Sequence, residues 1–253
     1  MPQTRDSVRP DGLIARLNPR ASDCFSCARR SSCLAGDLND GQLADYNSRI
    51  QQNQTYQPGD PVFTMGEPFQ GMYIVKSGFF ESYSVTEDGN SKVTGFYIAG
   101  DIFGLESIGE GGHTYTTEAL SVGSACLVPL SLLRENSETG LALLHKMLEL
   151  MGRIILSDRA LIYSLATMNA SQRIATFLVN LTTRMEHAGF RKGELVLHMH
   201  RIDIGSYLGL AEETVSRVFS RFHDRGILRI RRRYIKHYDL DGLRAIARGD
   251  IQC

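Results

Sequence analysis

Residues 201–228, RIDIGSYLGLAEETVSRVFSRFHDRGIL, read as two short helices joined by a tight turn. The first helix is expected from Ile202 to Leu208, Gly209 stands at the turn, and the second helix is expected to begin near Glu212 or Glu213. Apolar residues recur along the second helix at helical spacing, so one of its faces is expected to be buried against the first helix. They are Val215, Val218, Phe219 and Phe222. This order of elements predicts a helix-turn-helix, whose second helix enters the major groove of DNA.

The opposite face of the second helix carries Glu213, Ser216 and Arg217, at positions i, i+3 and i+4. Arginine can donate two hydrogen bonds to guanine, glutamate can accept one from cytosine N4, and serine can serve either base type. Seven basic residues and one acid follow in residues 221–237, a local excess that suits phosphate contacts. A Glu-x-x-Ser-Arg can arise by chance and an arginine-rich hairpin can be solvated surface. Adjacent and in this order, the two features predict DNA binding.

The whole chain has no global charge bias, because its 253 residues carry 28 Lys+Arg and 28 Asp+Glu. That length allows two ordinary domains. No apolar run is long enough to span a membrane, and residues 1–23 lack the apolar core of a signal peptide. The expected compartment is a reducing cytoplasm, where clustered thiols bind metal or sense redox state more often than they form disulfides.

The texture of the sequence changes four times, which predicts five segments. Residues 1–20 are expected to be disordered, and residues 21–50 carry three cysteines and a short polar helix. Residues 51–130 consist of short apolar runs with turn signals every 8–12 residues, typical of an antiparallel barrel or sandwich. Residues 131–168 are expected to be helical, and residues 169–253 to form a mostly helical DNA-binding domain.

The helical stretch has apolar residues spaced alternately by three and four positions over three heptads, with one polar exception, Asp158. The spacing is that of a coiled-coil seam, so the chain is predicted to pair with a second copy. A helix packed on its own domain is the plainer alternative. Asp158 could also lie at the edge of the seam, solvated or paired with Arg159. The seam positions are Leu141, Leu144, Leu148, Met151, Ile155, Asp158, Ile162 and Leu165.

Three of the five cysteines lie close together near the start of the chain, with the spacing C-x2-C-x5-C. They are Cys24, Cys27 and Cys33, and a four-thiolate site would take its fourth ligand from Cys126 or Cys253. Zinc and a [4Fe–4S] cluster both need four such ligands. The spacing favours the cluster, because no second C-x2-C or histidine pair follows, and leaves zinc open.

The combination of a glycine-rich β-region, a long helix and the stretch LGLAEETVSRVFSRF resembles the CRP/FNR superfamily of bacterial transcription regulators, and ETVSR resembles its FNR branch. The resemblance covers the chain after its first twenty residues. It implies an α+β fold: an N-terminal cysteine loop, an antiparallel β-roll of the cyclic-nucleotide-binding type, a long dimerisation helix and a C-terminal winged helix-turn-helix. It implies a regulator, not an enzyme.

The resemblance also assigns residues. Cys24, Cys27, Cys33 and Cys126 match the ligands of an oxygen-sensitive [4Fe–4S] cluster, while Cys253 has no counterpart. Glu213, Ser216 and Arg217 match the readers of TTGAT-type half-sites in an inverted repeat. Asp158 matches a carboxylate that opposes dimer formation in the cluster-free state, and Ile155 supplies the offsetting contact. Residues 85–93 match a contact with RNA polymerase.

Two competing functions use the same fold. A cyclic-nucleotide pocket is disfavoured. The cyclic-AMP-binding branch of the superfamily clamps the phosphate with an arginine in the corresponding stretch, and residues 103–121 contain none. A regulator that responds to a small molecule or to thiol oxidation, without a cluster, stays open. An iron–sulfur enzyme or electron carrier is disfavoured, because no nucleophile–base pair or phosphate-binding loop is visible and an electron carrier needs no DNA-reading helix.

Overall fold

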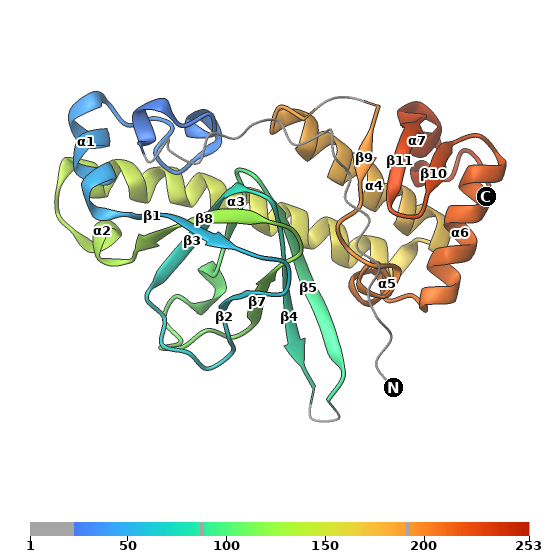
Figure 1. Cartoon of the computed structure of the whole chain (residues 1–253), viewed down its shortest axis with the longest axis horizontal. Helices are drawn as coiled ribbons and strands as arrows, with labels where there is room; N and C mark the ends of the chain where they lie inside the picture. The colour runs from blue at the N-terminus through green and yellow to red at the C-terminus, as the bar shows by residue number, and fades with distance from the viewer. Residues whose placement is uncertain (1–22, 87–88, 191–192, 253) are drawn as a thin grey trace.

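The computed structural model describes residues 23–86, 89–190 and 193–252 (Figure 1). The segment predicted to be disordered and Cys253 lie outside these ranges. The fold is α+β, as predicted: an N-terminal segment, two antiparallel sheets, a long helix and a helical C-terminal domain. Among the described residues, no helix combines the length and the apolar character that crossing a bilayer requires.

The N-terminal segment consists of two single-turn helices and a regular one. Its elements are η1 (Cys24–Ser26), η2 (Arg30–Ser32) and α1 (Asp40–Arg49). A reciprocal pair of hydrogen bonds between Asn39 and Gln42 caps the start of α1, a signal that the sequence carries as N-x-x-Q. Helix α1 buries Leu43 and Tyr46 beneath the cysteine-bearing turns.

The β-roll is formed by two four-stranded antiparallel sheets with orders β1-β8-β3-β6 and β2-β7-β4-β5. Its elements are β1 (Gln51–Tyr56), β2 (Pro61–Phe63), β3 (Gly71–Ser77), β4 (Phe79–Val85), β5 (Ser91–Ile98), β6 (Ile102–Phe103), η3 (Leu105–Ser107), β7 (Thr116–Ala119) and β8 (Gly123–Pro129). Gly78, between β3 and β4, has φ +86°, and a Cβ there would lie 2.5 Å from the Cα of Gly123. Only glycine allows this crossing.

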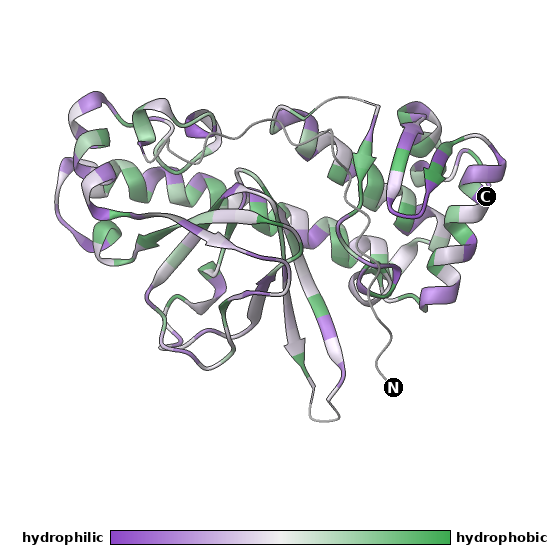
Figure 2. Cartoon of the chain, viewed as in Figure 1, coloured by the Kyte–Doolittle hydropathy of each residue, from purple (hydrophilic) through white to green (hydrophobic). Residues whose placement is uncertain are grey.

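The predicted helical stretch 131–168 is divided into α2 (Ser131–Arg134) and α3 (Glu138–Thr167). The division arises because the Ser137 side chain accepts a hydrogen bond from Gly140 N and starts a new helix. Helix α3 has 30 residues and runs along the β-roll to the C-terminal domain (Figure 1). Hydrophobic segments recur along it (Figure 2).

The C-terminal domain packs four helices against a three-stranded sheet of order β10-β11-β9. Its elements are α4 (Ala170–His187), β9 (Leu195–Val196), α5 (Arg201–Leu208), α6 (Glu212–Asp224), β10 (Leu228–Arg231), β11 (Tyr234–Tyr238) and α7 (Leu240–Arg248). The apolar residues predicted to share one face of α4 are buried in this domain, namely Ile174, Phe177, Leu178 and Leu181.

The C-terminal domain is docked on the β-roll through α4 and α5. The rings of Phe96 in β5 and Tyr207 in α5 meet edge to face, 5.2 Å between centroids. The Ser206 hydroxyl accepts a hydrogen bond from Val93 N, and Arg184 of α4 forms an ion pair with Asp101. The hydrophobic core of the C-terminal domain therefore continues into the sheet of the β-roll.

Candidate DNA-binding and metal-binding sites

Helices α5 and α6 form the predicted helix-turn-helix. Gly209 ends α5 in the left-handed region, at φ 62°, and Leu210 N donates a hydrogen bond to Gly205 O. Gly205 itself lets the chain return closely, because a Cβ there would lie 2.6 Å from Leu210 O. The four apolar residues predicted on the inner face of α6 are all buried. The outer face is thereby fixed toward solvent.

The three predicted base readers lie exposed on this outer face of α6. Glu213 is in the first turn, and Ser216 and Arg217 follow one turn later. A hollow of about 560 Å³ beside Arg217 is lined by Thr214, Ser216, Arg217, Ser220 and Arg221. Side chains in this position can reach base edges when a helix lies in a major groove.

The strands β10 and β11 form the wing beside α6. All seven basic residues of the stretch 221–237 are exposed, so the predicted cationic surface exists on the folded chain. Arg232 is at the tip of the wing with φ 56°, the left-handed conformation of a tight hairpin turn. The exposed cations suit contacts to the phosphates on either side of a groove. They are Arg221, Arg225, Arg229, Arg231, Arg232, Arg233 and Lys236.

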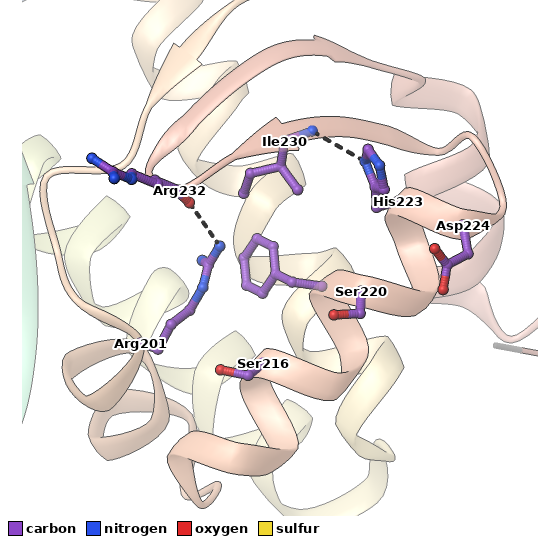
Figure 3. Close-up of a pocket in the computed structure, with 8 residues that line it drawn as sticks. Arg201, Ser216, Ser220, His223, Asp224, Ile230 and Arg232 are labelled. Carbon is purple, nitrogen blue, oxygen red and sulfur yellow. Dashed lines mark hydrogen bonds between the residues drawn. The ribbon is translucent and has the colours of Figure 1, made fainter.

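Arg201 is a residue of this site that the sequence pattern did not single out. Its guanidinium lies over the ring of Phe219, 3.5 Å from the centroid, and donates a hydrogen bond to Arg232 O at the wing tip (Figure 3). Burial, and then the charge of Arg233, lower the pKa of Arg201 to about 10. Arg201 lines a hollow of about 310 Å³ between α6 and the wing, with His223 and Ser216 (Figure 3). It therefore fixes the angle between the reader helix and the wing.

The cysteines predicted as ligands come from two segments. Cys24, Cys27 and Cys33 lie in the turns around η1 and η2, and Cys126 lies on β8, paired with Ile74 of β3. All four are half-buried thiols. Cys24 and Cys33 pack on one hydrophobic cluster that joins the N-terminal segment, the β-roll and α3. Its members on α3 are Leu143 and Met147.

Cys27, Cys33 and Cys126 lie near enough to Cys24 to affect its ionisation. Burial, and then the neighbouring Cys33, Cys126 and Cys27, raise the pKa of Cys24 to about 12. Burial, reinforced by Cys126 and Cys27, raises the pKa of Cys33 to about 11. Bare thiolates are therefore unfavourable here, and positive charge among the sulfurs would stabilise them. This donor chemistry fits a group of iron or zinc ions.

The spacing of the thiols is less compact than a single-ion site requires. Within the described part of the chain, no three or more histidine, cysteine or carboxylate side chains are arranged to hold one metal ion. Zinc bonds of about 2.3 Å place tetrahedral thiolates about 3.8 Å apart. In a [4Fe–4S] cluster each thiolate binds a different iron, so its ligands stand further apart.

The predicted seam residues lie exposed along α3, except Leu165, which is half-buried. The six apolar ones from Leu141 to Ile162 have exposed fractions of 37% to 65%, while Leu143 and Met147, on another face, are buried. Ile155 and Asp158 are both exposed. Partial burial raises the pKa of Asp158, and its carboxylate interacts with Tyr207 of α5. Asp158 thus occupies the predicted seam position, close to Tyr207 of the C-terminal domain.

The interior of the β-roll is filled with aromatic rings. Phe63 stacks on His113 at 3.6 Å between centroids, and Tyr73 stacks on Phe103 at 5.3 Å. His113 is buried, and burial lowers its pKa. This packing occupies the space between the sheets with apolar side chains.

These features define a class of protein: a winged helix-turn-helix carried by a β-roll and a long helix. Residues 172–246 match the Crp-like helix-turn-helix domain, and residues 53–138 match the cyclic nucleotide-binding domain. The chain is 35% identical to electron transport regulator A of Shewanella oneidensis over 90% of its length and 92% of the relative's. It is equally similar to the fumarate and nitrate reduction regulatory protein of Escherichia coli K12, over 90% and 91% of the two chains.

The chain belongs to the CRP/FNR family of transcription regulators, in its FNR-type branch, as its sequence predicted. It is a DNA-binding regulator. The structure of FixK2 from Bradyrhizobium japonicum is similar, with a TM-score of 0.66 and 31% identity over 76% of this chain and 94% of that one. A CRP/FNR-family regulator from Thermus thermophilus shares the fold, with a TM-score of 0.61 and 22% identity over 78% and 98% of the two chains.

Proposed function

We propose that this chain is an oxygen-responsive transcription regulator, mainly an activator of anaerobic genes, that uses a [4Fe–4S] cluster to control its dimerisation. Cys24, Cys27, Cys33 and Cys126 would hold the cluster. The observation that carries the proposal is that Cys27, Cys33 and Cys126 all lie near Cys24, and that Cys24 and Cys33 pack on the hydrophobic cluster that also contains Leu143 and Met147 of α3. The relatives named for fumarate and nitrate reduction and for electron transport support it.

A cluster explains the thiol site better than zinc does, since the thiols interact without converging on one point. When bound, a [4Fe–4S] cluster supplies a group whose integrity depends on oxygen. Its thiolate bonds would tie the N-terminal segment to β8. The segment in turn packs on Leu143 and Met147, and an ion pair at 2.6 Å joins Asp37 to Lys146 of α3. The proposed ligands would thus be linked to the dimerisation helix through the packing of the N-terminal segment.

Opposing contributions at the seam would make dimer formation conditional. The exposed apolar residues of α3, Ile155 among them, favour pairing with a second copy. Asp158 opposes it, because two carboxylates would approach across an apolar interface and lose water. With the N-terminal segment held against α3 the pairing prevails. Without that packing, Asp158 decides the balance and the chain returns to monomers.

Arg29 provides a second link, from the cysteine loop to the DNA-binding domain. Its guanidinium donates a hydrogen bond to Ala188 O at the C-terminal end of α4 and lies 6.0 Å from the centre of the Phe190 ring. A cation is favourable at a helix C-terminus and over an aromatic face. Movement of the cysteine loop would therefore change its contacts with the DNA-binding domain.

The dimer would bind an inverted repeat of TTGAT-type half-sites about one helical turn apart. Glu213, Ser216 and Arg217 would read bases, and the wing would contact phosphates. Residues 85–93, of which 87 and 88 lie outside the described residues, connect β4 to β5 and would contact RNA polymerase. The chain would act in the cytoplasm. A cyclic nucleotide is not expected to bind, because aromatic side chains fill the β-roll and no arginine follows β6 up to Ser121.

A cluster-free regulator that responds to thiol oxidation or to a small molecule is the second candidate. It is favoured by Cys24, Cys27, Cys33 and Cys126 all being thiols outside any disulfide, because such thiols can be oxidised reversibly. The two candidates differ in what the four thiols carry when the protein is prepared without oxygen.

Analysis of anaerobically prepared protein decides between the two candidates. It measures the content of iron, acid-labile sulfide and zinc, and the visible absorption. We expect about four iron and four sulfide per chain and a brown colour that bleaches in air. Cys33→Ala should lose the iron, whereas Cys253→Ala should keep it. Colourless protein with one zinc per chain, or with no metal at all, would overturn the proposal.

A further inference from the structure

Tyr46 is a fully buried residue of α1 that the cluster proposal does not use. Its side chain is 0% exposed, in the hydrophobic cluster on which Cys24 and Cys33 pack. The next residue, Asn47, accepts a hydrogen bond from Cys24 N at 2.8 Å. Helix α1 therefore presents this tyrosine directly beneath the cysteine turns.

The hydroxyl of Tyr46 has no hydrogen-bond partner at normal distance among the described residues. Tyr56, also buried, donates its hydroxyl hydrogen to Gln54, and Tyr83 donates to Glu118. Burying a hydroxyl without a partner costs free energy, and phenylalanine would fill the same apolar space at no such cost. The hydroxyl of Tyr46 therefore suits a state of the protein in which an acceptor is present.

Sulfur atoms lie near this hydroxyl. It lies close to the thiols of Cys33, Cys24 and Cys126, and Cys33 is the one placed to accept a hydrogen bond from it. A protonated thiol is a poor acceptor. The same sulfur accepts much better once it is an iron-bound thiolate, because it then carries negative charge.

We propose that Tyr46 is a positioning residue that donates a hydrogen bond to a sulfur of the bound cluster, most directly the Cys33 thiolate. The proposal rests on the cluster-binding function given above. Hydrogen bonds to the sulfurs of such clusters stabilise the more negatively charged, reduced state and so raise the reduction potential. Tyr46 would thereby make the cluster harder to oxidise.

Tyr46→Phe tests the hydrogen bond, with Tyr56→Phe as the matched control. In cluster-free protein we expect Tyr46→Phe to unfold at the same or a higher urea concentration than the unsubstituted chain, because an unpartnered hydroxyl is removed. Tyr56→Phe should unfold at a lower one, because it loses a partnered hydroxyl.

In cluster-loaded protein we expect Tyr46→Phe, and not Tyr56→Phe, to impair the protein. Tyr46→Phe should show a lower reduction potential and lose its visible absorption in air about 10-fold faster, the size of effect typical of residues that orient metal ligands. Tyr56→Phe should match the unsubstituted chain in both. Iron–thiolate vibrations should shift in Tyr46→Phe alone.

Two results would overturn the inference: a cluster in Tyr46→Phe with unchanged potential and lifetime, or cluster-free Tyr46→Phe that is less stable than the unsubstituted chain. Neither result contradicts the proposal that the chain binds a cluster. An unsubstituted chain that assembles no cluster contradicts the proposed function instead, and the inference with it.

Discussion

At the scale of single residues, base reading and phosphate contact are separable on this surface. Arg217 projects from the exposed face of α6, and Arg231 lies on the wing. Arg217→Ala should weaken operator binding by about 1–3 kcal/mol and erase the preference for guanine at one position. Arg231→Ala should weaken binding to all sequences alike and reduce the slope against log salt by about one. Fluorescence anisotropy with matched and altered operators measures both. Equal losses of specificity in the two variants would contradict these roles.

Glu81 is the residue whose ionisation should shape stability. It is 7% exposed, and burial, then Asp203 of α5 and Glu118 of β7, raise its pKa to about 8. The folded chain therefore holds this carboxyl protonated at pH values where the unfolded chain has released the proton. Stability contributed in this way is present at low pH and is lost as pH rises towards 8, by a few kcal/mol in total.

Urea unfolding from pH 5.5 to 8.5 checks this expectation. Glu81→Gln should flatten the decline, because its amide cannot ionise. Glu110→Gln, on an exposed turn, should leave the decline as it is. If the stability of Glu81→Gln declines with pH at the same slope as that of the unsubstituted chain, other groups cause the decline.

At the scale of elements, α3 separates its tasks by face. Leu143 and Met147 hold the N-terminal segment, while the seam residues stay exposed. Asp158→Ala should therefore strengthen dimer formation at least 10-fold and allow operator binding in air, because the opposing carboxylates are gone. Arg159→Ala, exposed beside it, serves as the control. Sedimentation analysis of aerobic protein gives the answer, and a monomeric Asp158→Ala would remove Asp158 from the switch.

The helices and their buried and exposed faces could largely be predicted from the sequence, because helical periodicity is local. The inner face of α6, the exposed seam and the amphipathic α4 follow from spacing alone. The break before α3 depends on one serine cap and was not predicted. Neither were Arg201 on Phe219, the buried Glu81 or the proximity of Asp158 to Tyr207, because each depends on packing between distant segments. Cysteine spacing alone left Cys126 and Cys253 open as the fourth ligand.

At the scale of the whole molecule, the cysteine segment contacts both α3 and the DNA-binding domain. The cluster could therefore control DNA binding by two routes, and each route can be tested separately. Arg29→Ala removes the contact with Ala188 and Phe190. The variant should keep its iron content and its dimer mass. The ratio of operator affinities between cluster-loaded and cluster-free protein should become a few-fold smaller. Arg30→Ala is the matched control, because among the described residues Arg30 donates within its own segment, to Leu38 O. Unchanged coupling in Arg29→Ala would leave α3 as the sole route.

In the proposed function, iron held by four thiols decides whether two copies pair and bind DNA. The most direct measurement takes one anaerobic sample of known iron content and records its mass in solution and its affinity for an inverted repeat, before and after exposure to air. We expect a dimer with tight binding at first, then a monomer whose binding is at least 100-fold weaker, with Cys126→Ala monomeric throughout. Iron-loaded protein that pairs and binds no better than the iron-free chain would contradict the account.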